Sequence, residues 1–249
     1  MKRYLHAFAM TQSMFCSFPA PWKIWDEQAR PLMLLFLPLV GLEIGLVWAA
    51  LAWLFRYFAL NSLVTGLILC AVPYFASGCI HLDGFLDVTD AVHSWRDQEQ
   101  RRKILKDSHV GAFAVIYCVF VLLSGFALLA AAPAEASIGI LVWIPVVSRC
   151  CSALAITALR PMSTSQYAGA FRQDIPRTHP WILMAVGLAA LTLGFYFCGW
   201  YGFALIAVPV GYAFALARAF RSLGGMNGDI AGYALTIAEL CGCAVFALI

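Results

Sequence analysis

Long runs of apolar residues, divided by short polar segments, follow one another along almost the whole chain. Seven runs stand out, at residues 31–55, 58–79, 111–132, 138–159, 181–198, 201–217 and 230–249. A helix needs about 20 apolar residues to cross the hydrocarbon core of a bilayer, and each run is close to that length. Only Gly199 and Trp200 separate the fifth run from the sixth, so one long kinked helix or a re-entrant pair is the alternative there. The pattern predicts an all-α fold, a polytopic membrane bundle of about seven transmembrane helices.

Composition supports this fold class. Of the 249 residues, 63% are hydrophobic and 12% are charged, whereas soluble domains carry about 25% charged residues. This balance excludes a water-soluble globule, and the high hydrophobicity excludes disorder. The nine cysteines are an odd number and lie mostly in apolar runs, so we interpret them as reduced core residues rather than disulfide partners. We expect residues 1–249 to form a single integral membrane domain.

The charged residues lie mostly on one side of the predicted membrane. Fourteen of the 16 Lys and Arg residues precede the first run or lie between the second and third, fourth and fifth, or sixth and seventh runs. The positive-inside rule then predicts a cytoplasmic N-terminus and a C-terminus outside. Ten of the 13 Asp and Glu residues share the cytoplasmic side. We therefore expect a catalytic loop at 81–110 and a glycine-rich loop at 218–229 on that face, with 1–30 as an interfacial segment.

The strongest chemical signal is the acidic series Asp83, Asp87 and Asp90 after the second run. Positions i, i+4 and i+7 share one face of an α-helix. Three carboxylates there repel one another unless a cation lies between them, and oxygen ligands favour Mg²⁺, Mn²⁺ or Ca²⁺ over zinc. A solvated acidic helix end is the alternative. His81 falls on the opposite face and reaches this site only if the helix begins at Asp83; otherwise it is a headgroup-level or loop histidine.

Residues just before the third run are candidates for phosphate contacts. Lys106, Asp107 and Ser108 lie there, where the N–H groups of a helix start favour anions. Ser108 is alternatively a simple N-cap. We interpret the basic residues at 101–103 as anchors to anionic lipid.

A glycine-rich turn before the seventh run is the second candidate for phosphate contacts. It contains Gly224, Gly225, Asn227 and Asp229. Such a backbone can wrap an anion at a helix start, although Gly-Gly and Asn-Gly are also ordinary turn pairs.

Three ionisable residues lie inside the predicted spans: Glu43, Arg149 and Glu239. Charges in a membrane are costly and usually face the bundle interior in pairs. We expect Arg149 to pair with Glu43 or Glu239, and a polar core that faces substrate or carries protons is the alternative.

These motifs, in this order, resemble the cobalamin synthase family, the adenosylcobinamide-GDP ribazoletransferases. The resemblance begins at residues 36–45, continues through His81-Leu-Asp83-Gly84, Asp87 and Asp90, and then covers the segments 96–97, 106–111, 148–149 and 224–239. Ala91, Asn227 and Thr236 stand where the family usually has other residues, and the segment 160–168 lacks the usual Gly-Leu-Gly.

The resemblance implies Mg²⁺-dependent transfer. A hydroxyl of α-ribazole, or of its 5′-phosphate, attacks the cobinamide-bound phosphorus of adenosylcobinamide-GDP, and GMP leaves. Asp83, Asp87 and Asp90 are then the metal ligands, and Asp90 is also the candidate general base, with His81 as a further catalytic candidate. The implied substrate contacts are Lys106, Asp107, Ser108, Arg149, Gly224, Gly225, Asn227 and Asp229.

The implied setting is the bacterial cytoplasmic (inner) membrane, with a multi-pass chain and the active site at the cytoplasmic face. The partners are then the two small-molecule substrates and the lipid bilayer, with no nucleic acid and with a homo-oligomer left open. One alternative is a phosphotransferase acting on a CDP-alcohol, whose Asp-Gly-x-x-Ala-Arg string is absent from this sequence. The other is an ion-coupled transporter, whose sites lie near the membrane midplane rather than at a span end.

Overall fold

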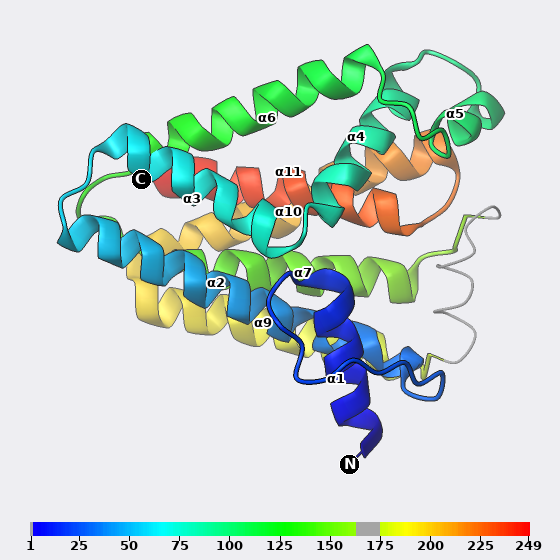
Figure 1. Cartoon of the computed structure of the whole chain (residues 1–249), viewed down its shortest axis with the longest axis horizontal. Coiled ribbons are helices and arrows are strands. Elements are labelled where there is room, and N and C mark those ends of the chain that lie inside the picture. Colours follow the sequence, from blue (N-terminus) through cyan, green and yellow to red (C-terminus); the bar gives the residue numbers. More distant parts are fainter. Residues whose placement is uncertain (1, 163–174) are drawn as a thin grey trace.

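The computed structural model describes residues 2–162 and 175–249, and in these residues it contains helices and one isolated bridge between Pro161 and Met226. The helices are α1 (Lys2–Phe15), α2 (Met33–Tyr57), α3 (Ser62–Ala76), α4 (Ile80–His93), α5 (Gln98–Ile104), α6 (Ala112–Ala131), α7 (Ile140–Ala158), α9 (His179–Cys198), α10 (Phe203–Leu223) and α11 (Gly228–Leu248). Short 3₁₀ turns occupy Arg30–Leu32 and Gly199–Gly202. The long helices run along the long axis of the molecule, and α1 crosses them (Figure 1). The all-helical prediction is confirmed for the described residues.

Five helical stretches are long and apolar enough to cross a membrane, by length and composition: Arg30–Tyr57, Ala112–Ala131, Ile140–Ala158, His179–Leu223 and Gly228–Leu248. A sixth is added if α3 and α4 together count as one broken span. The protein is therefore a polytopic helical membrane protein.

The stretch His179–Leu223 contains α9 and α10, which fold back on each other. Its 45 residues would extend roughly 68 Å as one straight helix, more than twice the hydrocarbon thickness. Instead, α9 ends where Gly199 has φ 57°, and the rings of Phe195 and Phe203 lie 5.3 Å apart. One long kinked helix, the alternative left open by the sequence, does not fit this close approach.

The predicted second run, 58–79, is not one straight helix. α3 ends after 15 residues, and the chain bends by 90° before α4. Gly78 and Cys79 make this bend with φ 62° and 59°, a conformation that strongly favours glycine and that Cys79 adopts with strain. Much of the segment predicted as the 81–110 loop is consequently helical, in α4 and α5.

Glycines set the closest helix contacts. A Cβ on Gly41 of α2 would lie 2.5 Å from the Pro145 carbonyl oxygen of α7. A Cβ on Gly84 of α4 would lie 2.8 Å from the Asp229 carbonyl oxygen of α11, and one on Gly232 would lie 3.0 Å from His81. Small residues of this kind let membrane helices approach backbone to backbone. The α4–α11 contact brings the acidic helix against the glycine-rich turn.

The N-terminal segment is packed more deeply than an interfacial helix. Ala7 and Met10 of α1 are buried against Met33. The Thr11 hydroxyl donates to the Met33 carbonyl at 3.0 Å, and the Gln12 amide donates to the Glu43 carboxylate at 2.7 Å. α1 thus forms part of the bundle and contributes to its polar interior.

Candidate active site

The acidic face of α4 is the starting point of the site. The helix begins at Ile80, and it carries Asp83, Asp87 and Asp90. Asp83 is exposed, whereas Asp87 and Asp90 are half-buried. His81 belongs to the other face and is 8% exposed, packed toward Gly232 of α11. The shared carboxylate face predicted from the spacing is therefore present. The expectation that His81 reaches the site only if the helix begins at Asp83 is wrong, because the helix begins at Ile80 and His81 still lines the same cavity as Asp83.

Asp229 of α11 joins this acidic face. Because Gly84 allows the backbones of α4 and α11 to touch, the negative charges of Asp83, Asp229 and Asp90 all act on Asp87. The side-chain amide N–H of Asn227 donates to the Asp229 carboxylate at 2.6 Å, and the side-chain oxygen Oδ1 of Asn227 accepts from the Ile230 backbone N–H at 2.9 Å. Asn227 thus caps α11 and orients Asp229. Two helices that are far apart in sequence, α4 and α11, supply one group of four carboxylates.

Asp90 has a different environment from the other acids. Its carboxylate accepts hydrogen bonds from the backbone N–H groups of Gly111 and Ala114, the second at 3.1 Å. These are donors that the first turn of α6 leaves unpaired. Asp90 therefore caps α6 from α4, and Gly111 rather than Ser108 is the N-cap residue.

A cavity of about 340 Å³ opens beside Asp83 and Asp229. Its polar lining residues are His81, Asp83, Ser152, Asn227 and Asp229. The apolar wall of the cavity is formed by Met14 and Phe15 of α1 and Leu34 and Leu37 of α2, and Ile80, Ile156 and Ala231 complete the lining. The buried Nε2 atom of His81 has no hydrogen-bond partner among the described residues. An apolar pocket with a few convergent polar groups is the usual form of a small-molecule site.

The predicted phosphate contacts before α6 are not among the residues that line this cavity. Lys106, Asp107 and Ser108 are exposed in the segment between α5 and α6. His109 donates to the Asp107 carboxylate at 2.6 Å, and this hydrogen bond lowers the pKa of Asp107 below its usual range. Asp107 therefore stays ionised near neutral pH.

The two glycines of the second turn shape the backbone. Gly224 ends α10 with φ 77°, and a Cβ on Gly225 would lie 2.5 Å from the Met162 Cα. The Arg102 guanidinium donates to the Leu223 carbonyl oxygen at 2.7 Å. Arg102, which we interpreted as a lipid anchor, therefore caps the end of α10.

The buried charges form an ion pair. Arg149 is 1% exposed, and its guanidinium pairs with Glu239 of α11. The Ser148 hydroxyl donates to the same carboxylate at 2.8 Å. Glu43 instead accepts from Gln12. The prediction that Arg149 pairs with an acid in the bundle is confirmed, with Glu239 as the partner.

A complete metal site is not preformed. Within residues 2–162 and 175–249, the structure contains no group of three or more His, Cys, Asp or Glu side chains arranged to hold a metal ion. Mg²⁺, however, usually takes only one or two protein carboxylates and completes its shell with water and substrate phosphate. Asp83, Asp87 and Asp229 supply oxygen donors of the right chemistry, so the residues present fit Mg²⁺.

Sequence reasoning missed the apolar wall of the cavity. Met14 and Phe15 come from α1, and Leu34 and Leu37 come from α2. Each of these residues looks like an ordinary bundle residue in the sequence. The only available signal was the hydrophobic periodicity of residues 2–15, which indicates a packed helix but not what it packs against.

Comparison with known proteins agrees with the motif pattern. The family described as cobalamin-5-phosphate synthase matches residues 7–247. An adenosylcobinamide-GDP ribazoletransferase of Clostridium perfringens strain SM101 is 33% identical over 251 residues, covering 100% of both chains. Proteins with the same name from Clostridium botulinum strain Alaska E43 and Desulfitobacterium hafniense strain Y51 are 31% and 32% identical, over 97% and 82% of both chains. No solved structure matches this chain. The chain belongs to the cobalamin-5-phosphate synthase family.

Proposed function

We propose that this protein is an adenosylcobinamide-GDP ribazoletransferase, which joins adenosylcobinamide-GDP to α-ribazole or its 5′-phosphate and releases GMP. This is the last assembly step of cobalamin biosynthesis. The observation that carries the proposal is that Asp83 of α4 and Asp229 of α11 line one cavity large enough for a small molecule, with Asp87 one helical turn after Asp83. Membership of the family supplies the reaction that this chemistry serves.

The reaction breaks a phosphoanhydride bond of the donor's diphosphate and forms a phosphodiester bond to the acceptor. The ribazole hydroxyl oxygen forms a new bond to the cobinamide-bound phosphorus, while the bond from that phosphorus to the oxygen of GMP breaks. Asp83 lines the cavity and is exposed, so we assign it to accept the hydroxyl proton; a positioned base of this kind contributes about 10²–10⁴-fold to the rate. Asp90 has both carboxylate oxygens engaged at α6, and we assign it to positioning that helix.

Asp87 and Asp229 are the residues that would hold Mg²⁺, with Asp83 beside them. When bound, Mg²⁺ withdraws negative charge from the diphosphate and so favours attack on phosphorus. Asn227 contributes by orienting Asp229 through its 2.6 Å hydrogen bond. The Arg149–Glu239 pair contributes by joining α7 to α11.

We further propose seven membrane crossings in the bacterial cytoplasmic membrane. They are α2, the broken pair α3–α4, α6, α7, α9, α10 and α11, and this count takes α9 and α10 as two spans because they fold back on each other. The bias of Lys and Arg residues supports a cytoplasmic N-terminus, an outside C-terminus and an active site at the cytoplasmic face.

The test is GMP release by the purified full-length protein in detergent, given adenosylcobinamide-GDP, α-ribazole and Mg²⁺. Excess EDTA should abolish release, and added Mg²⁺ should restore it. Asp83→Asn and Asp87→Asn should each lose at least about 10²-fold in rate while melting near the wild-type temperature. The matched control is Glu99→Gln, an exposed carboxylate paired with Lys103, which should keep its activity. Folded wild-type protein that releases no GMP, or that works fully in excess chelator, would refute the proposal.

A further inference from the structure

The cavity beside Asp83 is lined by apolar side chains of α1 and α2 and by the polar residues of α4, α7 and α11. We propose that it binds the acceptor nucleoside, with the base of α-ribazole against Leu37 and the side chains of α1, and with the ribose toward Asp83 and Asp229. This inference rests on the proposed function and deepens it, because it assigns one substrate to a particular place in the fold.

The volume of the cavity selects the acceptor over the donor. About 340 Å³ lies at the lower end of the roughly 300–1,000 Å³ that small-molecule sites occupy. A nucleoside fits such a space, whereas the corrin macrocycle with its side chains is far too large. The corrinoid must therefore lie outside the cavity and present only its diphosphate to the acidic rim.

The polarity of the walls selects this nucleoside over guanosine. The base of α-ribazole is a dimethylbenzimidazole, two flat fused rings with two methyl groups and one free ring nitrogen. Guanine carries several donors and acceptors, which the apolar wall would leave unpaired at a high free-energy cost. Among the described residues that line the cavity, one buried side-chain polar atom has no hydrogen-bond partner, Nε2 of His81. The protein and the base thus each bring one unpaired nitrogen. Nε2 of His81 can donate a hydrogen bond to the free ring nitrogen of the dimethylbenzimidazole.

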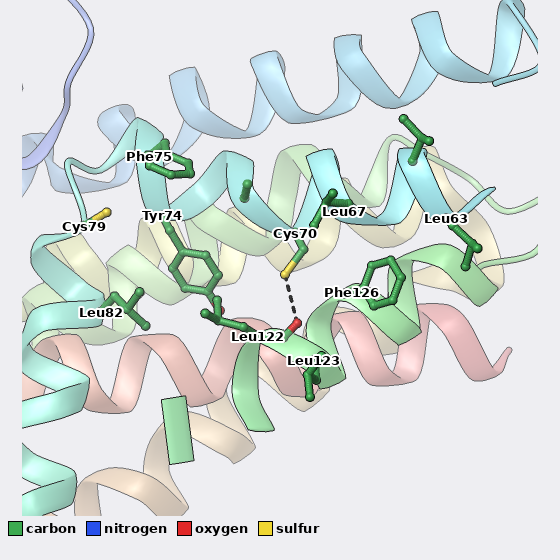
Figure 2. A pocket seen from close by; sticks show the side chains of 12 residues that line it. Leu63, Leu67, Cys70, Tyr74, Phe75, Cys79, Leu82, Leu122, Leu123 and Phe126 are labelled. Carbon is green, nitrogen blue, oxygen red and sulfur yellow. Dashed lines mark hydrogen bonds between the residues drawn. The ribbon is translucent and has the colours of Figure 1, made fainter. Parts of the chain in front are cut away.

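A second, larger cavity does not offer the same features. About 560 Å³ of space lies between α3 and α6, lined by apolar residues together with Tyr74 and two cysteines (Figure 2). No charged side chain of the described residues lines it. Leu67 on its wall is 62% exposed, as expected of a groove that faces lipid chains. Nothing there would hold a ribose near the carboxylates, so this groove serves as the control site.

The first test fills each cavity and measures the Michaelis constants of the two substrates separately. Met14→Trp places a larger side chain at the wall of the cavity and should raise KM for α-ribazole about 10-fold or more, with little change in KM for adenosylcobinamide-GDP. The matched control is Met184→Trp, at a methionine of α9 that is 40% exposed. Leu67→Trp fills the control groove. Both controls should leave the two constants unchanged.

The second test keeps the inference falsifiable if Met14→Trp folds poorly. Wild-type protein should bind α-ribazole about 10-fold or more tightly than the riboside of unmethylated benzimidazole, because methyl groups in a close-fitting apolar pocket contribute that much. Leu37→Ala enlarges the wall and should shrink this preference. His81→Phe keeps a flat ring but removes Nε2, and it should weaken binding of both ribosides equally.

The outcomes separate this inference from the proposed function. Two results would overturn the cavity assignment and leave the activity standing. One is a wild-type KM for α-ribazole in folded Met14→Trp protein that still releases GMP. The other is a preference for the methylated riboside that Leu37→Ala leaves unchanged. A rise confined to KM for adenosylcobinamide-GDP would place the donor in the cavity and also overturn it. Absence of GMP release from folded wild-type protein would instead refute the proposed function.

Discussion

Gly84→Ala tests whether the α4–α11 contact sets the geometry of the acidic cluster. The added Cβ would lie 2.8 Å from the Asp229 carbonyl oxygen and 2.9 Å from the Asp229 Cα. Ordinary van der Waals contact begins near 3.4 Å, so from 2.8 Å the helices must separate by about 0.6 Å. Both clashing atoms belong to the backbone, and no side-chain rotation relieves the contact.

The effect on stability and the effect on rate should differ. Overpacking costs about 1–3 kcal/mol, and alanine returns about 1 kcal/mol through its higher helix propensity. The net loss in unfolding free energy should therefore be about 0–2 kcal/mol. A displacement of 1 Å at an active site costs on the order of 10²-fold in rate, so about 0.6 Å between Asp83 and Asp229 should cost on the order of 10-fold.

The assay combines thermal unfolding in detergent with the rate of GMP release per folded molecule. The control is Gly187→Ala on α9, whose added Cβ would meet the Cys150 Cβ at 3.4 Å, an ordinary contact. It should be neutral or slightly stabilising and fully active. Wild-type GMP release from folded Gly84→Ala protein would refute the reasoning, because the spacing of α4 and α11 would then not control the site.

Three further predictions follow from the buried contacts and the topology. Arg149→Ala should lower the unfolding free energy by about 3–5 kcal/mol, since it leaves Glu239 uncompensated. Adding Glu239→Gln should recover part of this loss. Equal melting temperatures of Arg149→Ala and wild-type protein would contradict a structural role for Arg149. Asp90→Ala should lower the unfolding free energy by about 1–2 kcal/mol, because the α6 cap is lost. Asp90→Asn keeps one acceptor oxygen and should retain most of the activity per folded molecule. If Asp90→Asn folds well but is inactive, Asp90 is a metal ligand or a base. Reporter fusions should place residue 103 in the cytoplasm and residue 135 and the C-terminus outside, and a cytoplasmic C-terminus would show that the count of seven crossings is wrong.

The sequence by itself determined the fold class and the chemistry of the acidic face. Membrane insertion depends on the summed hydrophobicity of about 20 consecutive residues, which is a local property. The common face of Asp83, Asp87 and Asp90 depends only on helical spacing, which is also local. Both predictions needed no knowledge of the neighbours of these residues.

The partners of each polar group were decided only by the tertiary structure. Asp90 caps α6 and Glu239 rather than Glu43 pairs with Arg149, because long-range packing selects among partners that the sequence leaves equivalent. The 90° bend between α3 and α4 turns the acidic helix against α11, and Gly84 allows their backbones to touch. The cavity exists only where α1, α2, α4, α7 and α11 meet. A cavity is space left between packed surfaces, so no segment of the chain encodes it alone.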